Sequence, residues 1–203
     1  MKKITLICVL ALAIFCFAAC TGASQQPAQE PETSGEAAES AESAEPAIPQ
    51  PTDEEVEQAY QEATEASWWF RMLALETDPA TATEYEGNEG YCKVLRFSTL
   101  AELRAYLETL FSDEVIDAFL AESGYVEING ELYTREGARG SDIFKGEETL
   151  AVERESDSRI ILKVRVEILD PDADFAVTGY EEFDFPYEYT GNKWVFTDFP
   201  VVR

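Results

Sequence analysis

The sequence predicts an α+β domain in which N-terminal helices pack on a curved antiparallel sheet, as in cystatin-like or NTF2-like folds. Two observations carry this prediction. Apolar residues recur at helical spacing up to about residue 120, and they alternate with polar residues from about residue 125 to the end. The chain has 203 residues, and about 150 of them remain once a leader and a low-complexity segment are set aside. That length fits a single domain at residues 53–203 better than two domains.

The first residues have the composition of an export signal. Two lysines precede an apolar run at residues 4–19, which is short for a membrane-spanning helix but suits the core of a signal peptide. Small residues then lead to Cys20 in an arrangement that resembles the lipobox of bacterial lipoproteins, with Phe17 in place of the usual Leu. We therefore predict a lipoprotein signal peptide at residues 1–19 and a lipidated Cys20, which would anchor the protein outside the cytoplasm on the cell membrane. An ordinary secretory leader cut near the same place is the alternative.

The segment after Cys20 is expected to be a disordered linker. Residues 20–52 are rich in Ala, Glu, Pro and Ser, and from residue 21 onward they contain no aromatic and no basic residue. Such a segment buries too little apolar surface to offset the entropy lost on ordering. We interpret it as a tether that holds the domain at a distance from the membrane, inside the cell wall.

Three helices are expected in the first half of the domain. The candidate starts are Thr52, Thr99 and Ser112, and a glutamate follows three residues after each of the first two, as in a capping box. Apolar residues then recur mostly at helical spacing over residues 56–74, and the third helix should stop before Gly124.

The second half reads as antiparallel strands with one face in water. Asn129-Gly130 is a strong two-residue hairpin signal, because a type I′ turn needs positive φ at both central positions. Alternating apolar residues mark the other strands, which are joined by short polar turns. The expected strands are residues 91–97, 125–128, 132–134, 150–154, 160–168, 183–189 and 194–199.

Composition excludes several classes of function. The chain contains no histidine, so Ser-His-Asp and Cys-His catalysis and every imidazole metal site are excluded within it. The net charge of −26 makes nucleic acid a poor partner, because phosphate binding needs clustered Lys and Arg. Cys92 is the one cysteine of the domain, so it has no partner for an internal disulfide, and we interpret it as a small buried thiol. A carboxylate pair with glycosidase chemistry would need no histidine, but sequence spacing cannot identify one. We expect no enzymatic activity and no cofactor.

Two other patterns leave alternatives open. Asp170, Asp172, Asp174 and Glu181 have part of the spacing of a calcium loop, although Phe175 stands where such loops need glycine; a solvated acidic connection between strands explains the same residues. Trp68, Trp69 and Phe70 are consecutive on the first expected helix, so they cannot all face one core. One tryptophan is expected to be exposed as a contact surface, or else packed at the helix edge.

The glycine-rich residues 136–142 are expected to form a mobile loop that exposes Arg135 and Arg139. Exposed arginine in such a loop is often an anchor at protein interfaces. An internal ion pair with one of the many carboxylates is an equal alternative.

Several stretches taken together resemble the IseA-type D,L-endopeptidase inhibitor family of Gram-positive bacteria. They are residues 98–107, 111–114, 129–133, 139–142 and 193–199, which read STLAELRAYL, FSDE, NGELY, RGSD and KWVFTDF. The resemblance covers about residues 55–203. It implies a non-enzymatic protein that binds the catalytic domain of peptidoglycan D,L-endopeptidases of the NlpC/P60 kind and thereby restrains autolysis.

On this hypothesis, the expected partner contacts lie on the hairpin and the loop after it, at Tyr133, Arg135, Arg139 and Asp142. A domain charge of −22 would steer the inhibitor towards a basic partner. The alternative from a different class is a cell-surface module that binds a small ligand, because curved sheets covered by helices often enclose an apolar pocket.

Overall fold

The computed structural model describes residues 47–138 and 140–203. The predicted signal peptide, Cys20, most of the linker and Arg139 lie outside the described residues. Within them, no helix has the length and apolar character needed to cross a membrane.

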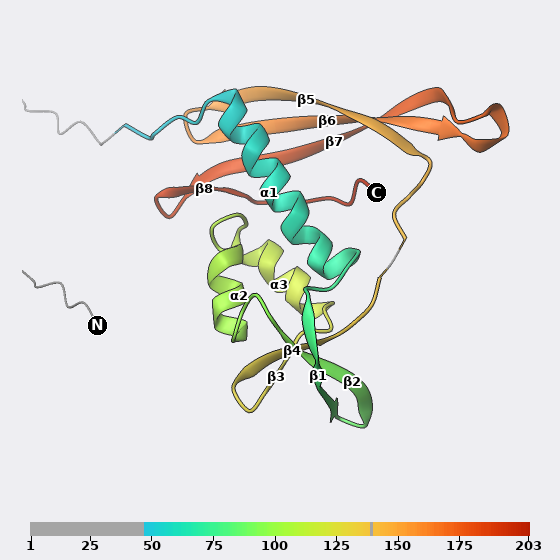
Figure 1. The fold of residues 1–203 in the computed structure, drawn as a ribbon. Coiled ribbons are helices and arrows are strands. Elements are labelled where there is room, and N and C mark those ends of the chain that lie inside the picture. The colour runs from blue at the N-terminus through green and yellow to red at the C-terminus, as the bar shows by residue number, and fades with distance from the viewer. Residues whose placement is uncertain (1–46, 139) are drawn as a thin grey trace, which may run out of the picture. The chain divides into compact units, whose positions relative to one another are not determined.

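The α+β fold predicted from the sequence is confirmed, because the described residues form three α-helices, one short 3-10 helix and eight antiparallel strands (Figure 1). The helices are α1 (Asp53–Arg71), α2 (Leu100–Leu107), α3 (Asp113–Ala121) and η1 (Pro171–Ala173). The strands are β1 (Thr77–Tyr85), β2 (Asn88–Val94), β3 (Val126–Ile128), β4 (Glu131–Arg135), β5 (Lys145–Ser156), β6 (Arg159–Asp170), β7 (Ala176–Thr190) and β8 (Lys193–Phe196).

The strands form two sheets of four strands, where the sequence suggested one curved sheet. The small sheet has the order β1-β2-β4-β3, and the large sheet has the order β5-β6-β7-β8 (Figure 1). The predicted hairpin at Asn129-Gly130 joins β3 to β4, with Ile128 opposite Glu131 and φ of 55° and 81° at the two turn residues. β1 was not predicted, because it contains Pro79 and several alanines and its register with β2 is irregular.

Helix α1 begins where the capping box places it. The Thr52 hydroxyl accepts a hydrogen bond from the Glu55 N–H at 3.2 Å, and the Glu55 carboxylate accepts one from the Thr52 N–H at 2.7 Å. At α2 only half of the predicted box forms: the Thr99 hydroxyl accepts a hydrogen bond from the Glu102 N–H at 3.1 Å, but the Glu102 carboxylate accepts one from the Ser98 N–H. The predicted side-chain cap at Ser112 is wrong: this residue occupies the N-cap position of α3, but its buried hydroxyl has no partner among the described residues, while its N–H donates to the Phe196 carbonyl.

Replacing Thr52 with alanine is expected to lower the free energy of unfolding by about 1 kcal/mol, because the Glu55 N–H in the first turn of the helix loses its acceptor. Hydrogen bonds from the Thr52 N–H and hydroxyl lower the pKa of Glu55, so the stabilisation by the Glu55 carboxylate is complete above the ordinary Glu pKa and is lost as the pH falls through the lowered value. Urea unfolding at neutral pH measures the loss. Ser112→Ala is the matched control and should change stability by less than about 0.5 kcal/mol, since its hydroxyl caps nothing.

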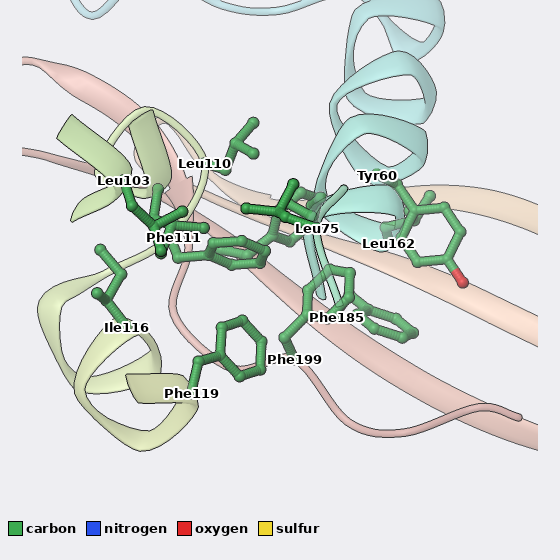
Figure 2. Packing of buried hydrophobic residues seen from close by; sticks show 14 of the residues in the cluster. Tyr60, Leu75, Leu103, Leu110, Phe111, Ile116, Phe119, Leu162, Phe185 and Phe199 are labelled. Atoms are coloured by element: carbon green, nitrogen blue, oxygen red, sulfur yellow. The ribbon is translucent and has the colours of Figure 1, made fainter. Parts of the chain in front are cut away.

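The core lies between α1, α2 and α3 on one side and the inner face of the large sheet on the other (Figure 2). Leu162 and Val164 of β6 are fully buried, and Lys163 between them is exposed on the outer face. There the Lys163 ammonium pairs with Glu153 at 3.4 Å and with Asp184 at 3.3 Å. The alternation predicted for this strand is therefore confirmed. Aromatic rings fill the centre of the core, and they are those of Tyr60, Phe111, Phe185, Phe196 and Phe199.

The last residues before α1 contact one end of the large sheet. The Pro49 carbonyl accepts a hydrogen bond from the Trp194 indole at 2.7 Å, and the Pro51 carbonyl accepts one from Arg154 at 2.8 Å. The same Arg154 guanidinium pairs with Asp53 at 2.6 Å, and the Gln50 side chain donates to the Asp157 carbonyl in the β5–β6 turn. These contacts fix the place where the preceding chain meets the domain.

Candidate functional site

The loop between β4 and β5, residues 136–144, connects the small sheet to the large sheet. Its first half crosses the short connection between α1 and β1. Ala138 forms an isolated antiparallel bridge with Leu73, and the Gly137 carbonyl accepts a hydrogen bond from the Ala74 N–H at 3.3 Å. The loop is therefore held by backbone pairing at its start.

The second half of the loop is fixed by a turn. The Asp142 carboxylate accepts a hydrogen bond from the Phe144 N–H at 2.9 Å, and its carbonyl accepts one from the Lys145 N–H at 3.3 Å. The Phe144 carbonyl in turn accepts from the Leu169 N–H of β6 at 2.7 Å. This turn leaves two neighbouring apolar side chains in solvent, Ile143 with an exposed fraction of 64% and Phe144 with 42%.

Two open grooves lie along the bridge between Leu73 and Ala138. One has a volume of about 340 Å³ and is lined on its far side by Arg71, Glu122 and Arg135. The other has about 770 Å³ and is bordered by Glu76 and Glu136. The Leu73 side chain, 63% exposed, lines both grooves. Exposed apolar groups beside charges of both signs are typical of protein contact surfaces.

Two buried contacts hold the connection beneath the loop. The Tyr125 hydroxyl accepts a hydrogen bond from the buried Leu75 N–H at 2.9 Å and donates to the Trp69 carbonyl at 3.1 Å. Burial raises the pKa of Tyr125 to about 12. Arg71 donates to the Phe199 carbonyl at 2.9 Å, and burial lowers its pKa. The end of α1 is thus fastened both to the strand that follows α3 and to the C-terminal segment.

Replacing Tyr125 with phenylalanine is expected to cost about 1–3 kcal/mol of unfolding free energy, because the buried Leu75 N–H loses its acceptor. The raised pKa means that the neutral phenol favours folding. Its contribution is complete below the ordinary tyrosine pKa near 10 and is lost as the pH rises towards 12. The variant should therefore lose less stability between pH 9 and 12 than the parent, as measured by urea unfolding across that range. Tyr180→Phe, which removes an exposed hydroxyl, should change neither the free energy of unfolding nor its loss between pH 9 and 12.

The structure separates the residues that the sequence suggested as partner contacts. Tyr133 and Arg135 share the outer face of β4, whereas Asp142 organises the turn in the loop, and Arg139 lies outside the described residues. No hydrogen bond or ion pair joins Asp142 to either of the first two within the described part of the chain. Arg135 has no carboxylate within 4 Å among these residues, so the alternative of an internal ion pair is not supported for it.

The structure also locates Cys92, the two neighbouring tryptophans and the candidate calcium loop. Cys92 is buried on β2, as predicted, and Trp68 is the exposed tryptophan, with Trp69 packed against Tyr106 at 5.5 Å. In the proposed calcium loop, Asp170 caps the short helix η1 by accepting from the Asp172 N–H, whereas Glu181 lies on β7 and pairs with Lys145. These carboxylates do not converge, and no group of three His, Cys, Asp or Glu side chains within residues 47–138 and 140–203 is placed to hold a metal ion.

Sequence reasoning missed the apolar part of the site. Ile143 and Phe144 follow a glycine-rich polar stretch, and two adjacent apolar residues in such a loop are a signal that was available in the sequence. Leu73 gave no signal, because it continues the helical spacing of α1. Its exposure depends on the helix ending at Arg71, which local pattern does not show.

A cavity between α1 and the C-terminal segment tests the alternative of a small-ligand module. It is lined by Tyr60, Thr64 and Trp68 from the helix and by Val201 and Arg203 from the tail, and its volume is about 30 Å³. That volume holds about one or two water molecules. Ligand pockets are typically about ten times larger or more. The cavity therefore does not support the binding of a small organic ligand.

Comparison with known proteins gives one family. The model of the IseA DL-endopeptidase inhibitor family matches residues 47–201, a span that contains every helix and strand described above. A search of curated proteins found no match.

Proposed function

The chain belongs to the IseA DL-endopeptidase inhibitor family, and from this membership we propose that it is a lipid-anchored inhibitor of peptidoglycan D,L-endopeptidases of the NlpC/P60 kind. The family role is inhibition of an endopeptidase, which requires binding and no catalysis by the inhibitor itself. The finer parts of the proposal are the anchor, the class of target enzyme and the surface that contacts it.

The observation that carries the contact surface is the loop of residues 136–144. Backbone hydrogen bonds fasten both of its ends, and yet Ile143 and Phe144 remain exposed. Hydrogen bonds hold the turn that carries this pair before any partner binds, so ordering it costs little conformational entropy and the burial of its apolar side chains adds to affinity. We propose that this apolar pair enters the cleft of the enzyme. Leu73 and the two grooves beside it would contact the edge of that cleft.

Charge supports the same arrangement. The chain carries 41 acidic and 15 basic residues, which would steer it towards an enzyme with a basic surface and accelerate encounter. Arg135 and Glu136 at the start of the loop, and Asp142 within it, supply polar groups at the edge of the apolar contact. Of the four contacts suggested by the sequence, Arg135, Arg139 and Asp142 remain part of this proposal. Tyr133 shares the outer face of β4 with Arg135 but lines neither groove, so we leave it out.

The proposed location rests on the leader. Residues 1–20 combine two lysines, an apolar run and a cysteine after small residues, which suits lipidation at Cys20 and attachment to the outer side of the cell membrane. Cys20→Ala is expected to abolish lipid labelling and to release the protein from washed membranes into the medium. Fractionation of cells that express each form measures this, with Cys92→Ala as the control that should remain on the membrane. Retention of the Cys20 variant on membranes would contradict the anchor.

The function is tested by hydrolysis of purified peptidoglycan by an NlpC/P60 catalytic domain, with and without residues 21–203 of this protein. We expect stoichiometric inhibition that weakens as salt rises from about 20 to 300 mM, because exposed charges are screened. A muramidase that cleaves the sugar chain of the same peptidoglycan is the control and should be unaffected. Unchanged hydrolysis by several NlpC/P60 enzymes would overturn the proposal.

A further inference from the structure

The outer face of the small sheet carries a group of aromatic and basic side chains, of which the proposed inhibitor contact uses only Arg135. We call it the tyrosine face, and it consists of Tyr85 on β1, Tyr91 and Lys93 on β2, and Tyr133 and Arg135 on β4. The three tyrosines thus lie on three neighbouring strands. Two strand spacings separate the outer ones across the sheet, about 10 Å.

Strand register places rings and cations in alternation. Tyr91 lies directly opposite Arg135, and Lys93 directly opposite Tyr133, so the two rings are diagonal neighbours. The Tyr85 and Tyr91 rings meet edge to face with their centroids 5.6 Å apart, and the Arg135 guanidinium lies 5.9 Å from the Tyr91 centroid. The Tyr85 and Tyr91 rings are thus in contact, and the Tyr133 ring lies on the next strand at the diagonal position.

Burial shows that this face is uncovered. On the inner side of the same strands, Cys92, Val94, Leu132 and Thr134 are buried, with exposed fractions of 7% or less. The side chains of the tyrosine face are half-buried or exposed, although they alternate with those buried residues along the strands. The residues described by the structure thus leave the rings open to solvent from above.

The cations of the face are partly compensated. Lys93 pairs with Glu131 and lies opposite Asp78 in the strand register, whereas Arg135 has no carboxylate within 4 Å among the described residues. A polyanion would be repelled by the rest of a chain with net charge −26. A protein partner is the competing occupant, because tyrosine and arginine are enriched at protein interfaces although lysine is depleted there.

We propose that the tyrosine face binds an uncharged glycan strand. Tyrosine presents a flat apolar ring with a polar tip, so ring faces can stack on sugar rings while the phenols and the Arg135 guanidinium hydrogen-bond to hydroxyl and amide groups. A strip of rings over three strands suits a linear chain of linked sugars. This site is separate from the loop of residues 136–144. It would hold the inhibitor on the glycan strand while the loop remains free to contact the enzyme.

The probe is the soluble hexamer of N-acetylglucosamine, titrated into residues 21–203 and followed by chemical shifts of the backbone amides. We expect shifts confined to β1, β2 and β4. The double variant Tyr91→Ala/Tyr133→Ala should weaken binding at least tenfold. Tyr180→Ala is the matched control, because this exposed tyrosine stacks on Arg165 at 3.6 Å on the outer face of the large sheet; it should change affinity less than twofold.

Three results would overturn the glycan proposal: no shift at millimolar hexamer with the unmodified protein, shifts centred on another surface, or an equal loss in the Tyr180 variant. A fourth measurement separates it from the inhibitor function. With a soluble peptide fragment as the enzyme substrate, the Tyr91/Tyr133 double variant should inhibit as well as the parent. Lost inhibition in that assay would assign the face to the enzyme contact and overturn glycan binding, whereas failure of the parent to inhibit would leave the shift mapping unaffected.

Discussion

Replacing Phe199 with alanine is expected to lower the free energy of unfolding by about 3–5 kcal/mol, the largest stability effect of any change considered for this protein. Phe199 lies in the C-terminal segment beyond β8 and is 5% exposed. Its ring is 4.9 Å from that of Phe185, 5.1 Å from Phe111 and 5.4 Å from Phe196. The variant would leave a cavity where helix α3, the large sheet and the tail meet (Figure 2).

Urea unfolding followed by far-UV circular dichroism measures this loss. Phe175→Ala is the matched control, since it removes the same side chain from the turn between β6 and β7, where Phe175 is 48% exposed. Its effect should be less than about 0.5 kcal/mol. Equal effects in the two variants would show that the aromatic cluster around Phe199 does not form the centre of the core.

Replacing Ile143 and Phe144 together with aspartate is expected to weaken inhibition of an NlpC/P60 endopeptidase by at least 100-fold. The two side chains are the exposed apolar groups of the loop, and a buried anchor at the centre of an interface typically contributes about 2 kcal/mol or more. Inhibition constants from hydrolysis of a soluble peptide substrate measure the effect. Circular dichroism should show the same folded content as the parent, because both residues are exposed.

The control for this variant separates lost contact from added charge. Thr190→Asp with Asn192→Asp adds the same two negative charges at the β7–β8 turn, at the other end of the large sheet from the loop. Asn192 has φ of 71°, a conformation that aspartate tolerates better than most residues. The control should inhibit within about threefold of the parent at moderate salt. If the Ile143/Phe144 variant inhibits equally well, the loop is not the part that enters the cleft.

Local signals predicted much of the fold. Thr52 and Thr99 begin helices because each satisfies a free N–H of the first turn, and Asn129-Gly130 turns the chain because both residues accept positive φ. These interactions join residues within four positions of each other, so a single sequence displays them. Ser112 also precedes a helix, but no glutamate follows it three residues on and its hydroxyl makes no capping bond; its N–H donates to the Phe196 carbonyl of β8, 84 residues further on.

The features that sequence could not show depend on distant contacts. Helix α1 could have continued to Ala74 by its apolar spacing, but Tyr125 binds the Leu75 N–H from 50 residues away, and the chain leaves the helix at Arg71. That early exit exposes Leu73 beside the loop. The division into two sheets arises in the same way, because β2, which pairs with β1 on one side, pairs on its other side with β4 across two intervening helices.

Strand β5 runs from the loop of residues 136–144 to the end of the large sheet that the residues before α1 contact. Lys145 follows the loop directly, and the turn after Ser156 receives the Gln50 side chain, close to where the N-terminal segment arrives (Figure 1). Twelve extended residues span about 40 Å. On the proposed anchor, the linker would therefore join the domain at one end of β5, and the inhibitory loop would lie at the other end, so that the length of this strand adds to the reach of the linker.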